Sequence, residues 1–308
     1  MHPAPTILIA EPLDQECLDW LAQRAAIVVS KPDDPDFAAT LTRADALIVR
    51  TYVRVTQSLL AAAPHLRVVG RAGVGLDNID LPACAARGIR VVNTPSANTQ
   101  AVVEFVLATI LDHIRPRQPL SDAPTAARWE SIRATQLADR QLSELTLGIL
   151  GLGRIGSALA RVAAALGTRV LYHDLLDIPP AARHASSPVT RDNLLAQSDI
   201  LSIHVDGRPS NRHLIDAAVL AQLKPTCLLI NTSRGVVLDT PALAAWLRAN
   251  PTARAALDVH DPEPFAPDYP LLGLPNAHLT AHLASGTRTA KRNMSWVCLL
   301  YTSPSPRD

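Results

Sequence analysis

The stretch LTLGILGLGRIGSALARVAAALGTRVLYHD, residues 145–174, decides the fold of this chain. It contains a short apolar run, a glycine-rich turn, an alanine-rich segment and a second apolar run that ends in an acid. That order predicts a strand, a turn, a helix and a second strand. A βαβ unit of this kind is typical of sheets that bind dinucleotides.

The glycines of the turn, Gly151, Gly153 and Gly156, have the spacing G-x-G-x-x-G. The first permits a tight turn, the second lets a pyrophosphate approach the backbone, and the third lets the helix pack closely on the sheet. The helix that begins near Arg154 and Ile155 would direct free N–H groups and its positive dipole end at the phosphates. We therefore expect these five residues to bind a dinucleotide rather than to form only a structural turn.

Asp174 ends the second predicted strand. A carboxylate at this position can accept hydrogen bonds from both hydroxyls of an adenosine ribose. The nearest arginine that follows it is Arg183, so a 2′-phosphate would meet a negative charge without a neighbouring cation. We therefore expect NAD as the cofactor in preference to NADP.

Composition excludes several classes of protein. The 308 residues are enough for two domains with large cores. The chain is 48% hydrophobic but only 4% aromatic, so its core must consist mainly of Ala, Val, Leu and Ile. Because 29 Lys and Arg balance 28 Asp and Glu without a long basic run, nucleic acid is not an expected partner.

The four cysteines are scattered without C-x-x-C spacing, so we expect neither a metal site nor a disulfide framework. Free, buried thiols are the simpler interpretation. Prolines and Glu11 interrupt any N-terminal signal sequence, and the best apolar stretch, residues 101–111, is too short to span a bilayer. A soluble, cytoplasmic protein without a membrane partner is expected.

Short runs rich in Val and Ile alternate with helix-like stretches over residues 6–93 and again after residue 145. This alternation predicts two α/β domains whose parallel sheets are covered on both faces. Residues 117–142 are polar and mixed, contain no clear strand, and are expected to form an arm, a lid or an interface.

Polar residues follow three predicted strands, where ligands of parallel sheets bind. They are Arg234, Glu263 and His282. Imidazole can exchange a proton near neutral pH while a hydride moves, and a neighbouring carboxylate favours its protonated form. An arginine can hold a substrate carboxylate and stabilise charge on a carbonyl oxygen. Any one of the three alone would more commonly be structural, but their joint placement favours catalysis.

Several blocks, taken together in order, resemble the D-isomer-specific 2-hydroxyacid dehydrogenase family over about residues 47–292, and within it the D-3-phosphoglycerate dehydrogenases. The blocks are GRAGVGLDNIDL (70–81), VVNTPSANTQAVVEF (91–105), LGILGLGRIG (147–156), INTSRG (230–235), LDVHDPEP (257–264) and TAHLASGT (280–287).

The resemblance implies two Rossmann-like or flavodoxin-like parallel-sheet domains with an active-site cleft between them. The substrate domain would comprise residues 1–97 and 286–308, and the NAD-binding domain residues 98–285. Within the latter, His282 would be the acid/base, Glu263 its carboxylate partner and Arg234 the substrate-orienting arginine. A homodimer would form through residues 98–114 and the arm.

The resemblance also implies further binding residues. Thr232 and Asp258 would lie near the nicotinamide ribose and carboxamide. The substrate would be held by Arg50 and by backbone N–H groups, which could form an anion-binding nest. That nest would comprise Ala72, Gly73, Val74 and Gly75.

The implied activity is NAD-dependent interconversion of a D-2-hydroxy acid and its 2-keto acid, with 3-phosphoglycerate and 3-phosphohydroxypyruvate as the first substrate pair. The alternatives are a hydroxypyruvate or glyoxylate reductase and a non-catalytic, NAD-sensing scaffold similar to corepressors.

The chain departs from the family at several positions. Asp206 and Ala281 replace prolines, His260 replaces an aromatic or apolar residue, and Tyr52 replaces a small residue. The last stretch, CLLYTSPSPRD at residues 298–308, resembles translated adapter sequence and is expected to be a non-native tail.

Overall fold

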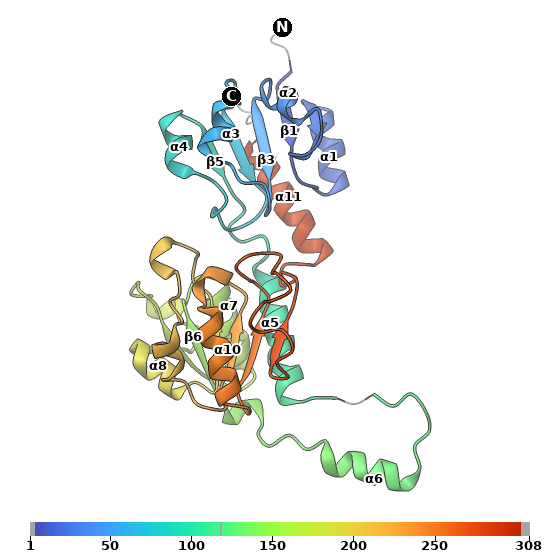
Figure 1. Ribbon diagram of the computed structural model, residues 1–308, viewed down its shortest axis with the longest axis vertical. Helices are drawn as coiled ribbons and strands as arrows, with labels where there is room; N and C mark the ends of the chain where they lie inside the picture. The colour runs from blue at the N-terminus through green and yellow to red at the C-terminus, as the bar shows by residue number, and fades with distance from the viewer. Residues whose placement is uncertain (1–3, 118, 303–308) are drawn as a thin grey trace. The chain divides into compact units, whose positions relative to one another are not determined.

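The computed structural model describes residues 4–117 and 119–302 (Figure 1). The chain divides into two compact units. Unit 1 comprises residues 1–101 and 285–308, and unit 2 comprises residues 102–284. The boundaries expected from the sequence fell after residues 97 and 285.

Unit 1 is built on a five-stranded parallel sheet of order β2-β1-β3-β4-β5, which is the flavodoxin-like order. Leu8 faces one side of this sheet and Ile7 and Ile9 face the other, so the two faces carry separate cores. The elements are β1 (Thr6–Ile9), α1 (Gln15–Ala22), β2 (Ala26–Val29), α2 (Phe37–Leu41), β3 (Ala46–Val49), α3 (Gln57–Ala61), β4 (Val68–Arg71), α4 (Leu81–Ala86), β5 (Arg90–Val92) and α11 (Arg288–Thr302).

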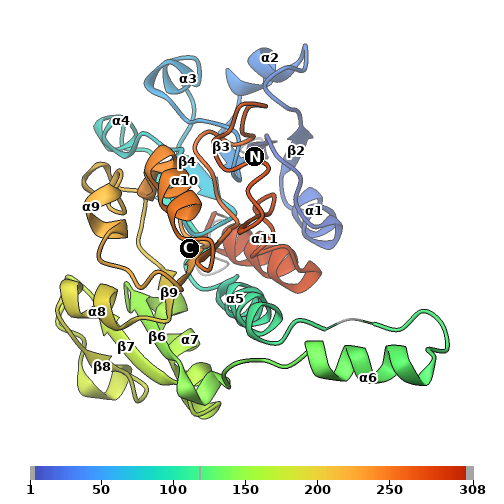
Figure 2. The ribbon, with the colours of Figure 1, turned by 60° about the horizontal axis from the view of Figure 1, so that its bottom comes forward.

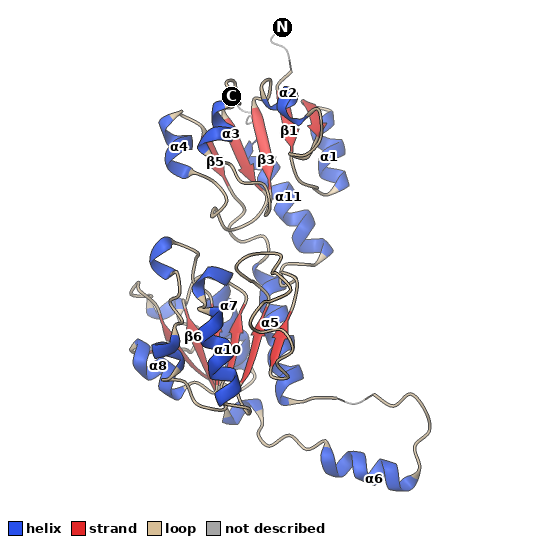
Figure 3. Ribbon diagram, viewed as in Figure 1, coloured by secondary structure: helices blue, strands red, loops and turns tan. Residues whose placement is uncertain are grey.

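Unit 2 contains a seven-stranded parallel sheet of order β12-β11-β10-β9-β6-β7-β8 (Figure 3). Helices α5 and α7 cover one face, and α8, α9 and α10 cover the other. The elements are α5 (Thr99–Ile114), α6 (Ala126–Thr135), β6 (Thr146–Leu150), α7 (Arg154–Ala165), β7 (Arg169–His173), β8 (Ser187–Pro188), α8 (Arg191–Gln197), β9 (Ile200–Ile203), α9 (Ala217–Leu220), β10 (Leu228–Asn231), α10 (Thr240–Ala249), β11 (Arg254–Leu257) and β12 (Ala277–Leu279).

The two predicted parallel α/β sheets are thus confirmed. Strand β6 lies between β7 and β9, so the chain leaves it in one direction and later returns on its other side. Such a reversal opens a crevice beyond the carboxyl end of the strand. The glycine-rich turn that follows β6 therefore lies where a doubly wound sheet binds ligands.

Helix α6 was not foreseen in the arm. None of its residues is buried, although the Thr125 side chain caps it by accepting a hydrogen bond from the N–H of Arg128 at 3.2 Å. Figures 1 and 2 both draw it away from the sheet of unit 2. Its sequence lacks an apolar stripe, and for that reason the usual helix periodicity could not reveal it.

The end of the chain contributes to unit 1. Helix α11 continues to Thr302, beyond the start of the expected tail. Cys298 and Leu299 are fully buried in the core that α1 and α11 share with β1. Residues 303–308 of the expected tail lie outside the described residues.

The cysteines are free and buried, as expected. Burial raises the pKa of Cys17, Cys227 and Cys298 to about 12 and also raises that of Cys84. Within residues 4–117 and 119–302, no helix is long and apolar enough to cross a membrane, and no cluster of three or more His, Cys, Asp or Glu side chains could hold a metal ion.

Asp199 connects the start of the central strands in unit 2. Its carboxylate accepts hydrogen bonds from the N–H of Thr146 at 2.8 Å, from Lys224 at 2.9 Å and from Arg140 at 3.0 Å. Burial would raise the pKa of Asp199, but these hydrogen bonds outweigh burial and hold it below its ordinary value. The ionised form is therefore favoured in the folded protein.

We expect Asp199→Asn to lower the free energy of unfolding by about 1 to 3 kcal/mol at pH 7, because the charged acceptor is lost. A depressed folded-state pKa contributes stability above the unfolded pKa of about 4, and this stability is lost as the pH falls through the folded value. Urea unfolding at pH 7 and pH 3 should show a larger difference at the higher pH. Asp122→Asn, at an exposed carboxylate, is the control; an equal effect of both substitutions would contradict this assignment.

Candidate active site

The turn after β6 has the geometry that its glycines predict. Gly151 has φ +94°, and a Cβ there would lie 2.7 Å from the backbone oxygen of His204. A Cβ on Gly156 would lie 2.2 Å from the oxygen of Gly151, so α7 can approach the turn only with glycine at this position. Both positions therefore tolerate a side chain poorly.

The space next to Gly153, at the start of α7, is not filled by other described residues. This glycine is the N-cap and offers no side chain to the first N–H groups of the helix, and no neighbouring atom lies within 4 Å of the Cβ position that it lacks. Arg154 and Ile155 begin the helix. Uncapped N–H groups at the start of a twelve-residue helix fit the phosphates of a dinucleotide.

Asp174 lies at the end of β7, beside the glycine turn. One carboxylate oxygen accepts a hydrogen bond from the N–H of Leu152 at 2.7 Å, and the other accepts one from Leu176 at 2.9 Å. A carboxylate has about four acceptor positions, so about two remain for a ribose diol. The residues of this turn therefore fit the adenosine end of NAD.

Arg208, a cation that the linear sequence did not place near this turn, lies within electrostatic reach of Asp174. Its pKa is raised mainly by its bond to Asp206 and to a smaller extent by the charge of Asp174. The loop after β9 thus returns towards the end of β7. Arg208 is held by Asp206 through hydrogen bonds of 2.7 and 2.5 Å, and these bonds lower the pKa of Asp206.

We expect Asp174→Ala to narrow the preference for NAD over NADP by an amount on the order of 1 to 3 kcal/mol, because ribose hydrogen bonds and repulsion of a 2′-phosphate are lost together. The ratio of kcat/KM for the two cofactors measures this. Asp177→Ala is the matched control, since this nearby carboxylate is almost fully exposed. An unchanged ratio in Asp174→Ala would mean that the carboxylate does not face the ribose.

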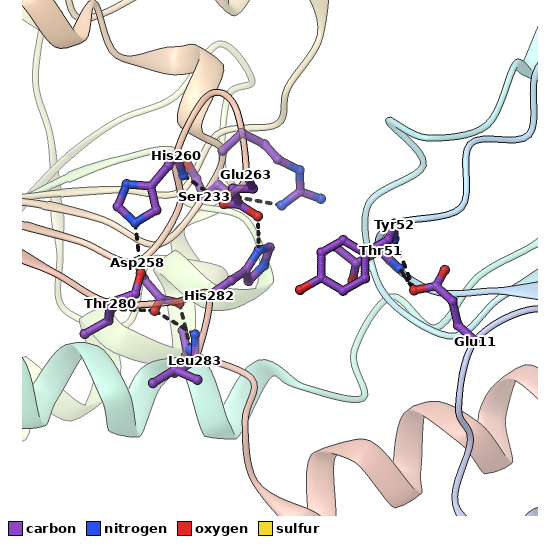
Figure 4. Close-up of polar contacts among 12 residues, drawn as sticks. Glu11, Thr51, Tyr52, Ser233, Asp258, His260, Glu263, Thr280, His282 and Leu283 are labelled. Carbon is purple, nitrogen blue, oxygen red and sulfur yellow. Dashed lines mark hydrogen bonds and ion pairs between the residues drawn. The ribbon is translucent and has the colours of Figure 1, made fainter. Parts of the chain in front are cut away.

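The predicted acid/base pair forms in unit 2 (Figure 4). The Nδ1 atom of His282 lies 2.8 Å from a carboxylate oxygen of Glu263, and the N–H of His260 donates to the other oxygen at 2.8 Å. An ionised carboxylate can only accept, so Nδ1 of His282 carries the hydrogen and Nε2 is the atom left for proton exchange.

Glu263 is ionised near neutral pH. Burial would raise the pKa of Glu263, but the hydrogen bonds from the His282 side chain and the His260 N–H outweigh burial and keep the pKa below its ordinary value. The ionised carboxylate holds the imidazole of His282 by its Nδ1 hydrogen and leaves Nε2 for proton exchange. The pair can therefore hold a proton and release it during a reaction.

The backbone that carries His282 is strained and anchored. His282 has φ +55°, which is uncommon for a residue with a side chain. Its N–H donates to the carbonyl of Asp258 at 2.9 Å. The Asp258 carboxylate accepts from Leu283 and Ala284 N–H groups at 2.7 Å and from the Thr280 hydroxyl at 2.6 Å. Asp258 is thus a buried anchor for this segment, and its expected contact with the cofactor stays a prediction.

Arg234 follows β10 and is positioned by a close backbone contact. The side chain of Asn231 donates to the carbonyl of Arg234 at 2.9 Å. A Cβ on the next residue, Gly235, would lie 2.0 Å from the backbone of His260, so this turn packs directly on the loop that carries Glu263. The three candidate catalytic residues therefore belong to touching segments of unit 2.

The hydroxyl of Thr232 also fits a bound ligand in this region. It is buried and has no hydrogen-bond partner among the described residues. Unpaired buried hydroxyls are uncommon, and an absent ligand is one explanation. This orphaned group fits the expected position near the nicotinamide ribose.

The substrate-binding candidates lie in unit 1, and the backbone nest there is smaller than expected. The N–H of Ala72 donates to Val49 and that of Gly73 to Arg71, at 2.9 and 2.8 Å. Gly73 makes room for the side chain of Arg71 rather than adopting positive φ. Among the described residues, only the N–H groups of Val74 and Gly75 in this stretch lack a backbone partner.

Arg50 begins a loop that sequence reasoning did not connect to Glu11. The buried Glu11 carboxylate accepts hydrogen bonds from the N–H groups of four successive loop residues at 2.6 to 3.2 Å, namely Arg50, Thr51, Tyr52 and Val53. The available signal was an acid directly after a buried strand. Glu11 fixes the loop backbone, so the N–H groups of residues 50–53 are not available to a ligand.

Comparison with known proteins gives a consistent result. Residues 107–284 match the model of the D-isomer specific 2-hydroxyacid dehydrogenase NAD binding domain. The chain is 36% identical to D-3-phosphoglycerate dehydrogenase from Mycobacterium leprae over 93% of its own length and 54% of the relative's. It is 35% identical to glyoxylate reductase from Aeropyrum pernix, over 94% and 90%.

A solved structure of D-lactate dehydrogenase from Aquifex aeolicus in complex with NAD and lactic acid is similar to the whole fold. Its TM-score is 0.81 at 26% identity, and the match covers 96% of this chain and 93% of that one. The chain thus spans about half the length of the phosphoglycerate relatives but most of the length of the other two.

Proposed function

The chain belongs to the D-isomer specific 2-hydroxyacid dehydrogenase family, and on that premise we propose that it interconverts a D-2-hydroxy acid and its 2-keto acid. The family match confirms the expected NAD cofactor. The observation that carries the proposal is the hydrogen bond between Glu263 and His282. The loop that carries Glu263 packs on the turn that contains Arg234. Both belong to unit 2, which also contains the dinucleotide turn.

NADH, when bound, supplies the hydride for reduction of the keto acid. The Nε2 atom of His282 donates the proton to the carbonyl oxygen as the alcohol forms. Glu263 stays ionised and stabilises the imidazolium before the transfer. Arg234 binds the substrate carboxylate and polarises the carbonyl. In the oxidative direction His282 takes the hydroxyl proton back.

The first substrate pair that we propose is 3-phosphoglycerate and 3-phosphohydroxypyruvate, after the resemblance to phosphoglycerate dehydrogenases. Reduction of hydroxypyruvate or glyoxylate is the second candidate. It is supported by the 35% identity to the glyoxylate reductase and by the bulky, exposed Tyr52 on the loop that Glu11 fixes. The complete Glu263–His282 pair favours an enzyme over a non-catalytic NAD-sensing scaffold.

We also propose that two copies associate through α5 and the arm. Helix α6 buries none of its own residues in the chain. A cavity of about 550 Å³ lies between α5 and the strands β10 to β12, lined in part by Phe105, His113, Leu228 and Arg254. An arm without buried residues and a mainly apolar cavity in the same unit are both suited to a partner copy.

We expect His282→Ala to lower kcat by about 100-fold to 10,000-fold with little change in NADH affinity, since a positioned acid is lost while the dinucleotide turn is intact. The assay is NADH oxidation with hydroxypyruvate, glyoxylate and pyruvate, and NAD reduction with 3-phosphoglycerate. Tight NADH binding by the parent without turnover of any 2-keto or 2-hydroxy acid would favour the scaffold. Near-normal turnover of His282→Ala per folded molecule would make this histidine structural.

Glu263→Gln should give a working enzyme whose reductive activity is lost at lower pH than in the parent. The amide keeps the shape of the carboxylate but removes the negative charge next to the imidazole, and a neighbouring negative charge is what favours a protonated ring. The pH profile of reductive kcat/KM measures this shift. Asp261→Asn, which removes a charge from the same loop at the Arg212 pair, is the control, and a basic limb that stays in place in Glu263→Gln would contradict the coupling.

A further inference from the structure

A second histidine, His260, is buried next to the acid/base pair. Its ring Nε2 lies 2.8 Å from the carbonyl oxygen of Thr280, and its Nδ1 lies 3.2 Å from the hydroxyl of Tyr269. A carbonyl can only accept, so Nε2 carries a hydrogen. Nδ1 then accepts from Tyr269 when the ring is neutral. This histidine stands where the resemblance leads one to expect an aromatic or apolar residue.

The partners of His260 suit that arrangement. Burial raises the pKa of Tyr269, so its hydroxyl keeps its proton, and Thr240 forms a further hydrogen bond with it. The His260 ring also packs edge-on against Phe265 and Tyr269, with centroid distances of 4.7 and 5.5 Å. The ring is thus fixed by two hydrogen bonds and two aromatic contacts.

His260 contacts both segments that carry the pair. Its backbone N–H donates to Glu263, and its ring donates to Thr280, two residues before the strained His282. Figure 4 draws the side chains of His260, Glu263 and His282 around the same strand ends. A change at this one residue would therefore displace the carboxylate and the imidazole relative to each other.

We propose that His260 is a positioning residue, whose ring holds the Thr280 carbonyl against the Glu263 loop so that Glu263 and His282 meet in the orientation needed for proton transfer. Its catalytic consequence rests on the proposed function. His260 itself exchanges no proton with substrate, because both ring nitrogens face protein groups.

The test compares His260→Phe with His260→Gln. Phenylalanine keeps the ring contacts but leaves the Thr280 carbonyl without the imidazole donor and removes one partner of the Tyr269 hydroxyl. Glutamine is long enough to donate to Thr280 again, so it is the conservative rescue. Leu220→Ala, in the core of the same unit, is the control for lost stability alone.

The first readout does not depend on turnover. In protein labelled with ¹⁵N-histidine, the Nδ1 proton of His282 bonded to Glu263 should give a downfield, slowly exchanging NMR signal. We expect this signal to weaken or disappear in His260→Phe and to return in His260→Gln, whereas Leu220→Ala should keep it.

The second readout is kinetic. His260→Phe should lower reductive kcat by up to about 100-fold, as displacement of catalytic groups by about 1 Å can do, with unchanged NADH affinity. The basic limb of its pH profile should move to lower pH, and His260→Gln should recover most of both effects. If His260→Phe does not fold, Tyr269→Phe replaces it. Of the two hydrogen bonds that fix the His260 ring, this substitution removes only the one to Nδ1, so the basic limb of the pH profile should move to lower pH by a smaller amount.

The outcomes separate the two proposals. A parent that shows the His282 signal, loses it in His260→Phe and yet turns over no hydroxy or keto acid would overturn the proposed function while supporting the positioning of the pair. An active parent whose His282 signal and pH profile survive in His260→Phe, with only the melting temperature lowered, would overturn the positioning proposal and leave the function intact.

Discussion

The buried carboxylate of Asp258 holds together the strand ends on which the candidate chemistry depends. A charge with 1% exposure would be costly without compensation. Three hydrogen bonds from residues 280–284 stabilise it, and its own backbone carbonyl accepts the N–H of His282. The carboxylate thus offsets the strain of the left-handed backbone at His282. This anchor places the backbone of His282 so that its imidazole can bond to Glu263.

Parallel sheets bring these residues together for a simple reason. Strands β10, β11 and β12 are neighbours in one sheet and run in the same direction, so the residues that follow them meet at one edge. Sequence alone could predict this for Arg234, Glu263 and His282, because each follows a recognisable apolar run. The glycine turn was equally predictable, because φ and close packing restrict Gly151 and Gly156.

Other features depend on contacts between distant segments and escaped the sequence. The N–H groups of the loop at Arg50 bond to Glu11 across about forty residues. The charge of Asp174 reaches Arg208 although the two residues are far apart in the sequence. Helix α6 has no apolar stripe, and none of its residues is buried. Gly73 was assigned to a nest, but its lack of a side chain accommodates Arg71.

The buried thiols make the chain a reporter of its own local opening. A cysteine reacts as its thiolate, and burial suppresses this form in the folded state. Modification by an alkylating reagent therefore proceeds through transient exposure. Cys17, Cys84 and Cys298 belong to unit 1 and Cys227 to unit 2, so the labelling rates of individual cysteines measure how often each unit opens, without any introduced probe.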